Sequence, residues 1–154
     1  EVTPFLINLG NDKEEVEKIK QQLSIYSKST KHTIKGITYS LSGKIKRAIQ
    51  EYGRALEINP QDKSAQRLLT HLLEYIYVNR GNELQYKGDI EGAIVSYEKA
   101  LEVNPNSTIA HYNLALTYLR KGMREEAKIE LKKVLQMNPG IKTARELLDQ
   151  LENF

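Results

Sequence analysis

The dipeptide Asn-Pro occurs three times, and each copy ends a segment of matching sequence. The three copies are Asn59-Pro60, Asn104-Pro105 and Asn138-Pro139, separated by 45 and then by 34 residues. Residues 48–60 are identical to residues 93–105 at eight of thirteen positions, and residues 127–139 match the second segment at five. Because self-similarity at such a period is typical of repeat architectures, we predict an array of similar structural units.

Small residues also recur at fixed distances before each Asn-Pro. Three columns hold Gly36, Gly81 and Ala115, then Gly43, Gly88 and Gly122, then Ala48, Ala93 and Ala127. Apolar side chains follow the last column at helical spacing, as in Ile49, Tyr52 and Leu56. We interpret each copy as two helices in close contact at the alanine. The chain would reverse at the glycine of the second column, where left-handed backbone is allowed. The second helix would end before the proline.

This pattern resembles the tetratricopeptide repeat, a helix–turn–helix unit of about 34 residues with small residues where its helices meet. The resemblance covers roughly residues 29–141. Only the third copy matches fully: the position that is usually Trp holds His32, Tyr77 and His111, and the following Leu position holds Lys35, Arg80 and Leu114. The resemblance implies an all-α fold, a right-handed solenoid of helix–turn–helix repeats that forms an α-α superhelix with a C-terminal capping helix.

The repeats divide the chain into six segments. They are an N-terminal strap and amphipathic helix (1–28), a degenerate first repeat (29–62), a helical insertion (63–73), a second repeat (74–107), a third repeat (108–141) and a capping helix (142–154). The predicted helices span about 12–27, 29–42, 45–58, 62–87, 90–103, 107–121, 124–137 and 141–152. Eleven inserted residues are almost three helical turns, so the insertion can lengthen one helix without rotating its packing face. Alternatively, it is a capping helix fused into the next repeat, because residues 59–72 match residues 138–151 at seven of fourteen positions. Both readings predict one helix of unusual length.

Composition excludes most catalytic chemistry. The chain has 154 residues, the length of one ordinary domain, and no cysteine, which rules out disulfides and thiolate sites. His32, His71 and His111 lack metal-ligand spacing, and no phosphate-binding glycine loop or nucleophile elbow occurs. His32 and His111 share one repeat column, so we predict that they pack. Ser107 follows Asn106 in a glycosylation pattern but is better placed to cap a helix. We predict a non-enzymatic protein with no cofactor and no metal.

By the resemblance, the first helix of each repeat lines a concave groove that holds a peptide or a partner's helix. The first repeat would contribute Thr33, Ile34, Ile37 and Leu41. The later repeats would contribute Tyr75, Val78, Asn79, Asn82, Gln85, Tyr86, Ile109, Tyr112, Asn113, Leu116 and Arg120. Side-chain amides suit this use because they both donate and accept hydrogen bonds, and tyrosines add flat area with a polar tip. Burial against neighbouring helices is the alternative, above all for Tyr75, Ile109 and Leu116.

Co-chaperones of this family hold the carboxy-terminal tails of heat-shock chaperones in a clamp of Lys and Asn side chains. By the resemblance, the clamp positions of this chain are Thr33, Ile37, Asn79, Ile109 and Asn113. Only Asn79 has the required residue type. We therefore predict that the chain does not form this clamp.

Uneven charge supports an alternative function. Net charge is +3, yet residues 28–56 hold seven cations against Glu51 alone. A basic patch of Lys35, Lys44, Lys46, Arg47 and Arg54 would attract nucleic acid or an anionic membrane. No nucleic-acid recognition motif accompanies it, so we favour a solvated basic face.

A third hypothesis is that the chain is an appended domain of a larger enzyme or membrane protein. Its start at Glu1 instead of Met and the apolar residues 5–7 favour this reading, in which residues 1–10 are the end of something larger. The favoured function is a protein–protein interaction scaffold with a protein or peptide partner that the sequence does not identify. Self-association stays open because few repeats leave an end to cover. No apolar run reaches the length of a membrane span. We expect a soluble domain, with the cytoplasm slightly favoured over a periplasmic or membrane-tethered location.

Overall fold

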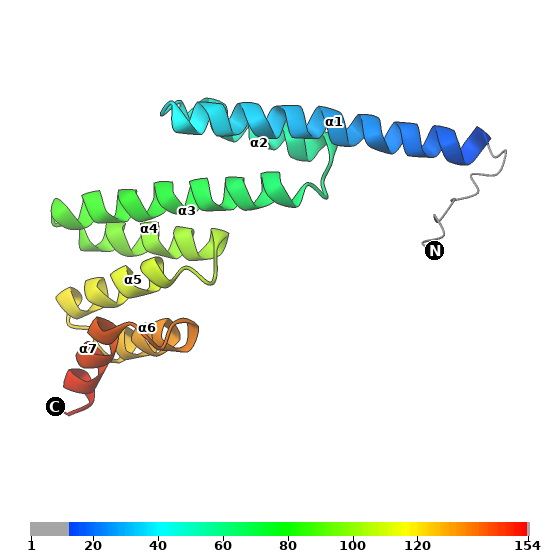
Figure 1. Cartoon of the computed structure of the whole chain (residues 1–154). Coiled ribbons are helices and arrows are strands. Elements are labelled where there is room, and N and C mark those ends of the chain that lie inside the picture. The colour runs from blue at the N-terminus through cyan, green and yellow to red at the C-terminus, as the bar shows by residue number, and fades with distance from the viewer. Residues whose placement is uncertain (1–12, 154) are drawn as a thin grey trace, which may run out of the picture. The chain divides into compact units, whose positions relative to one another are not determined.

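A computed structural model describes residues 13–153 of the chain, which form helices and no strands (Figure 1). The strap predicted within residues 1–10 lies outside these residues. The helices are α1 (Lys13–Leu41), α2 (Ile45–Ile58), α3 (Lys63–Tyr86), α4 (Ile90–Val103), α5 (Thr108–Lys121), α6 (Arg124–Met137) and α7 (Lys142–Glu152). The all-α fold is therefore confirmed, and the predicted bounds of α2, α4 and α6 agree with the structure.

The predicted break between two helices at residue 28 is wrong, because α1 runs unbroken through it. The prediction treated the start of the first repeat as the start of a helix. No glycine or proline lies near residue 28 to end a helix. The first half of α1 extends past α2 (Figure 1), and its apolar residues Leu23 and Tyr26 are exposed.

The helix α3 is also continuous over 24 residues and contains the whole insertion at 63–73. The insertion therefore lengthens this helix, as its lack of glycine and proline predicts. The fold divides within α3 into two compact units, the first ending at Leu68 and the second beginning at Leu69.

Three glycines end helices in the left-handed conformation that the sequence predicts. Gly43, Gly88 and Gly122 have φ of 71°, 84° and 82°. The amide after each glycine closes the helix end, as where Met123 N–H donates to the carbonyl of Tyr118 at 2.9 Å. The end of the second helix of each repeat is an Asx turn: the side chain of Asn104 accepts from Asn106 N–H at 3.2 Å.

Glycine and alanine columns let the paired helices approach closely. Ala48, Ala93 and Ala127 are fully buried. A Cβ at Gly36 would lie 2.4 Å from Cε1 of Tyr52, and one at Gly81 would lie 2.4 Å from Cε1 of Tyr97. In each unit a tyrosine ring therefore occupies the space that the glycine leaves open.

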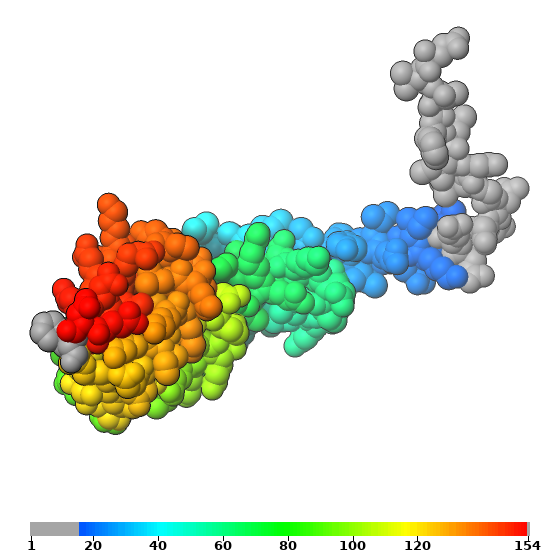
Figure 2. Space-filling view, turned by 90° about the horizontal axis from the view of Figure 1, so that it is seen from below, coloured from blue at the N-terminus to red at the C-terminus, as the bar shows by residue number. Residues whose placement is uncertain are grey.

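The third repeat uses a different pair at these positions. Ala115 replaces the glycine and Leu131 replaces the tyrosine, and both are fully buried in the core that α7 completes. Figure 2 shows α7, in red, lying against α6, in orange. From α7, Ala144, Leu148 and Leu151 enter this core, as expected of a helix that covers the end of a repeat array.

Candidate functional site: a cleft between α3 and α5

A cleft of about 240 Å³ lies between α3 and α5 of the second unit. Its lining consists of His71, Glu74, Tyr75, Val78, Asn79, Asn82 and Ile109. Five of these seven residues belong to the predicted groove, and His71 and Glu74 were not predicted. We call this hollow the α3–α5 cleft.

The α3–α5 cleft combines an apolar floor with exposed apolar edges. Val78 is buried, with 5% of its surface exposed, whereas Tyr75 and Ile109 are 61% and 54% exposed. Burial against neighbouring helices, the alternative for Tyr75 and Ile109, therefore does not hold in the second unit. Two exposed side chains beside a buried one provide apolar area that a partner can cover.

The amides of the cleft differ in what they offer a ligand. The Asn82 Oδ1 accepts from the Tyr97 hydroxyl at 2.7 Å and from Asn113 Nδ2 at 3.0 Å. Its NH₂ group has no hydrogen-bond partner within residues 13–153 and is available as a donor. The Asn79 side chain makes no hydrogen bond within residues 13–153, so its amide offers both a donor and an acceptor. These groups can hold a peptide backbone.

Glu74 has a structural role at the end of the cleft. It accepts from Asn104 Nδ2 at 2.7 Å and from the Ser107 hydroxyl. Ser107 also caps α5, accepting from Ala110 N–H at 3.2 Å, which confirms the predicted N-cap. His71 Nδ1 lies 3.6 Å from Glu74. These bonds join the start of the repeat to the loop before α5 and give the cleft a rigid end.

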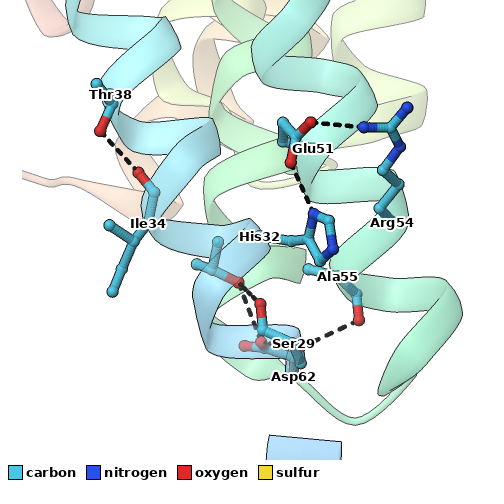
Figure 3. Close-up of polar contacts among 9 residues, drawn as sticks. Ser29, His32, Ile34, Thr38, Glu51, Arg54, Ala55 and Asp62 are labelled. Atoms are coloured by element: carbon cyan, nitrogen blue, oxygen red, sulfur yellow. Dashed lines mark hydrogen bonds and ion pairs between the residues drawn. The ribbon is translucent and has the colours of Figure 1, made fainter. Parts of the chain in front are cut away.

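An equivalent contact joins α1 to α3 in the first unit, with donor and acceptor exchanged (Figure 3). Ser29 Oγ donates to Asp62 Oδ2 at 2.6 Å, and Thr33 Oγ1 donates to the same oxygen at 3.1 Å. The other oxygen caps α3, accepting from Ser64 and Ala65 amides at 3.1 and 3.0 Å. Burial alone would raise the pKa of Asp62, but these hydrogen bonds hold it below its usual value.

The remaining predicted groove residues of the second unit do not line the α3–α5 cleft. Gln85 Nε2 donates to Thr117 Oγ1 at 2.9 Å. Tyr86 is 93% exposed near the end of α3. Arg120 is exposed, and Tyr112, Asn113 and Leu116 are half-buried. Among the residues expected from the first repeat, Thr33 is buried while Ile34, Ile37 and Leu41 are exposed.

The basic patch is exposed, although two of its cations have intramolecular partners. Lys35, Lys44, Lys46, Arg47 and Arg54 are all exposed. Arg54 Nη1 lies 2.7 Å from Glu51 Oε1, and the Arg47 guanidinium lies 5.8 Å from the centre of the Tyr39 ring. Internal pairing leaves less of this charge for an anionic partner.

The histidines predicted to pack also form hydrogen bonds that the sequence analysis missed. His32 Nδ1 lies 2.7 Å from Glu51 Oε2. His111 is buried between Glu130 and the carbonyl of Pro105, its Nε2 3.0 Å from that oxygen. The hydrogen bond from His32 and the charge of Arg54 hold the pKa of Glu51 below its usual value despite burial. Both pairs are 19 residues apart, a repeated spacing that identifies them in the sequence.

Within the described residues, no three His, Asp or Glu side chains gather in a way that could hold a metal ion. None of the helices described combines the length and apolar composition needed to cross a membrane.

The fold and the cleft define a helical-repeat scaffold with a hollow between α3 and α5. The chain belongs to the tetratricopeptide repeat family. A family model described as TPR repeat matches residues 81–122. A second model, described as tetratricopeptide repeat, matches residues 32–62 and 109–141. This family consists of protein–protein interaction modules that are generally non-catalytic.

Solved structures show the same fold at low sequence identity. The C-terminal TPR-containing domain of an FK506-binding protein from Plasmodium falciparum is 22% identical with a TM-score of 0.51, covering 84% of this chain and 89% of its own. MamA is 18% identical with a TM-score of 0.51, covering 77% and 82%. The TPR domain of Arabidopsis OM64 is 18% identical with a TM-score of 0.50, covering 81% and 94%. No curated protein matches the chain.

Proposed function

We propose that this chain binds an extended segment of a partner protein in the α3–α5 cleft. The observation that supports the proposal most is the unpaired Asn79 amide between the exposed side chains of Tyr75 and Ile109. An amide that is free to donate and accept can pair with a peptide bond, whatever the side chains of the peptide. The apolar edges then cover its side chains.

Specificity for the partner would come from the shape and polarity of the lining. Val78 and Ile109 favour an apolar side chain. The Glu74 carboxylate is already occupied by Asn104 and Ser107. The lining also contains no lysine or arginine that could hold the carboxylates of an acidic tail, in keeping with the rejected clamp.

The proposal can be tested with peptides that are selected from a random linear library for binding to the chain. Peptides selected on the purified chain should bind Asn79→Ala at least about tenfold more weakly, since two hydrogen bonds contribute about 1 kcal/mol each. Ile109→Asp should abolish binding. A matched control is Ile129→Asp on α6, because Ile129 is also 54% exposed but lies outside the cleft. Equal affinity of wild type and Ile109→Asp, or equal loss in Ile129→Asp, would refute the proposal.

The basic patch provides the competing function and a separate measurement. If the chain binds RNA or DNA through this patch, affinity falls steeply with salt and is lost in a Lys44, Lys46 and Arg47→Glu variant. The proposal predicts that the same variant binds the selected peptides with unchanged affinity.

A further inference from the structure

The first and third repeats each contain a glutamate held between a histidine and a cation. In the first, Glu51 accepts from His32 at 2.7 Å and from Arg54 at 2.7 Å (Figure 3). In the third, Glu130 pairs with His111 and, at 2.7 Å, with Lys133. Both glutamate side chains are nine-tenths buried or close to it, with 8% and 10% exposed. The spacing of the three residues is the same in both repeats.

The second repeat keeps the cation but lacks the glutamate. The corresponding positions hold Tyr77, Ser96 and Lys99. Ser96 is buried and donates to the carbonyl of Gly92 at 2.8 Å. The side chains of Lys99 and Arg80 have no ion pair or hydrogen bond within the part of the chain that the structure describes. The second repeat therefore retains a lysine whose internal carboxylate is missing.

A cleft of about 210 Å³ opens at this place between α3 and α4. It is lined by Tyr77, Arg80, Leu84, Asp89, Gly92, Val95, Ser96 and Lys99. Gly92 and Ser96 stand where the first repeat has Arg47 and Glu51 and the third has Glu126 and Glu130. The loss of two long side chains leaves this space, which we call the α3–α4 cleft.

The α3–α4 cleft faces away from the α3–α5 cleft. Its α3 residues Tyr77, Arg80 and Leu84 alternate along the helix with Tyr75, Val78 and Asn82, which line the other cleft. At about 100° of rotation per residue, the two sets lie on opposite sides of α3. A ligand in one cleft therefore leaves the other open.

We propose that the α3–α4 cleft binds the carboxylate of a Glu or Asp side chain on an acidic segment of a partner protein. The carboxylate takes the place of the glutamate that the other two repeats supply internally. Lys99 and Arg80 donate charge-assisted hydrogen bonds to it. The Tyr77 hydroxyl, which has no partner within residues 13–153, provides a further donor.

The acidic member of the lining does not oppose this assignment. Asp89 is the N-cap of α4, and its Oδ1 accepts from Gly92 N–H at 2.9 Å. Its charge lies at the positive end of the helix dipole, which offsets it in part. With two cations and one anion, the lining is net positive.

Amide chemical shifts during titration with a blocked peptide containing a single central glutamate test the proposal. The glutamate peptide should shift amides within residues 77–99 and saturate in the millimolar range, as expected for one carboxylate at a partly exposed site. Lys99→Ala should weaken binding at least about fivefold. Lys133→Ala is the matched control, because that lysine already pairs with Glu130, and it should leave binding unchanged.

A second pair of variants separates charge from shape. Ser96→Glu supplies the missing carboxylate and should abolish peptide binding, whereas Ser96→Ala, which leaves the space open, should retain it within about twofold. Tyr77→His with Ser96→Glu rebuilds the arrangement of the other repeats and guards against a misfolded single variant. Equal binding of a glutamine peptide, equal loss in Ser96→Ala, or no saturable shift up to about 20 mM peptide would overturn the proposal. Tighter binding of inorganic phosphate at the same amides would overturn the choice of a carboxylate.

Discussion

Replacing Gly36 by Ala inserts one methyl group into a close contact between α1 and α2. The new Cβ would lie 2.4 Å from Cε1 of Tyr52, whose ring is only 2% exposed. Normal van der Waals contact needs about 1 Å more, and a ring buried in a close-packed core has no free space to move into. Overpacking of this size costs about 3 kcal/mol, and the higher helix propensity of Ala returns about 1 kcal/mol. The net loss of unfolding free energy is therefore about 2 kcal/mol.

Urea denaturation followed by the amide signals of α1 and α2 measures this loss. The urea curves should give an unfolding free energy about 2 kcal/mol below that of wild type. A separate thermal melt should show a fall in melting temperature of roughly 8–16 °C for a unit of this size. Gly53→Ala is the matched control, since nothing lies within 4 Å of its Cβ position. That variant should gain about 0.5–1 kcal/mol. If Gly36→Ala is as stable as Gly53→Ala, the close approach of α1 and α2 is refuted.

A compensating variant follows from the third repeat. There Ala115 and Leu131 occupy the same positions and are both fully buried. Tyr52→Leu should therefore recover part of the stability that Gly36→Ala loses. The coupling between the two changes, measured in a double-mutant cycle, should be at least about 1 kcal/mol.

Three further predictions concern helix ends and the contacts between repeats. Because the pKa of Asp62 is lowered in the folded state, its carboxylate stabilises the fold fully above the unfolded pKa of about 3.9. This stability is lost as the pH falls through the folded pKa. In urea titrations, the unfolding free energy of Asp62→Asn should therefore depend less on acid pH than that of wild type. Ser29→Glu alone places a second carboxylate beside Asp62 and should cost about 1–3 kcal/mol. The double variant Ser29→Glu with Asp62→Ser should recover stability, because the new glutamate carboxylate gives the unpaired Asn59 Nδ2 an acceptor. No recovery in the double variant would contradict this prediction. Gly122→Ala should cost about 1 kcal/mol by thermal melting because its φ is 82°.

The repeat frame could be read from the sequence because its causes are local. A glycine such as Gly122 is needed for left-handed backbone, and an Asn-Pro pair ends a helix whatever lies around it. The close contact of Gly36 with Tyr52 could also be read locally, because it depends on the small size of glycine. In contrast, the helix break predicted at residue 28 came from repeat alignment alone, without any local signal in the sequence.

The site was predictable only where the family pattern applies. Asn79 and Ile109 lie in the cleft as their repeat columns suggest. The role of Glu74 was missed because its partner, Ser107, lies 33 residues away. The α3–α4 cleft was missed because the sequence shows that Ser96 stands in the column of Glu51, but the space this leaves depends on how α3 and α4 pack.

The most direct test of the account is to map a selected peptide onto the chain by amide chemical shifts. The α3–α5 cleft predicts the largest shifts at Tyr75, Val78, Asn79, Asn82 and Ile109. Little change should occur at Tyr77, Arg80 and Leu84 on the far side of α3, or in α6. Nuclear Overhauser contacts should join the peptide to Ile109 and Tyr75. Shifts confined to α4 and α6, or contacts with Ile129 instead of Ile109, would contradict the assignment of the binding surface.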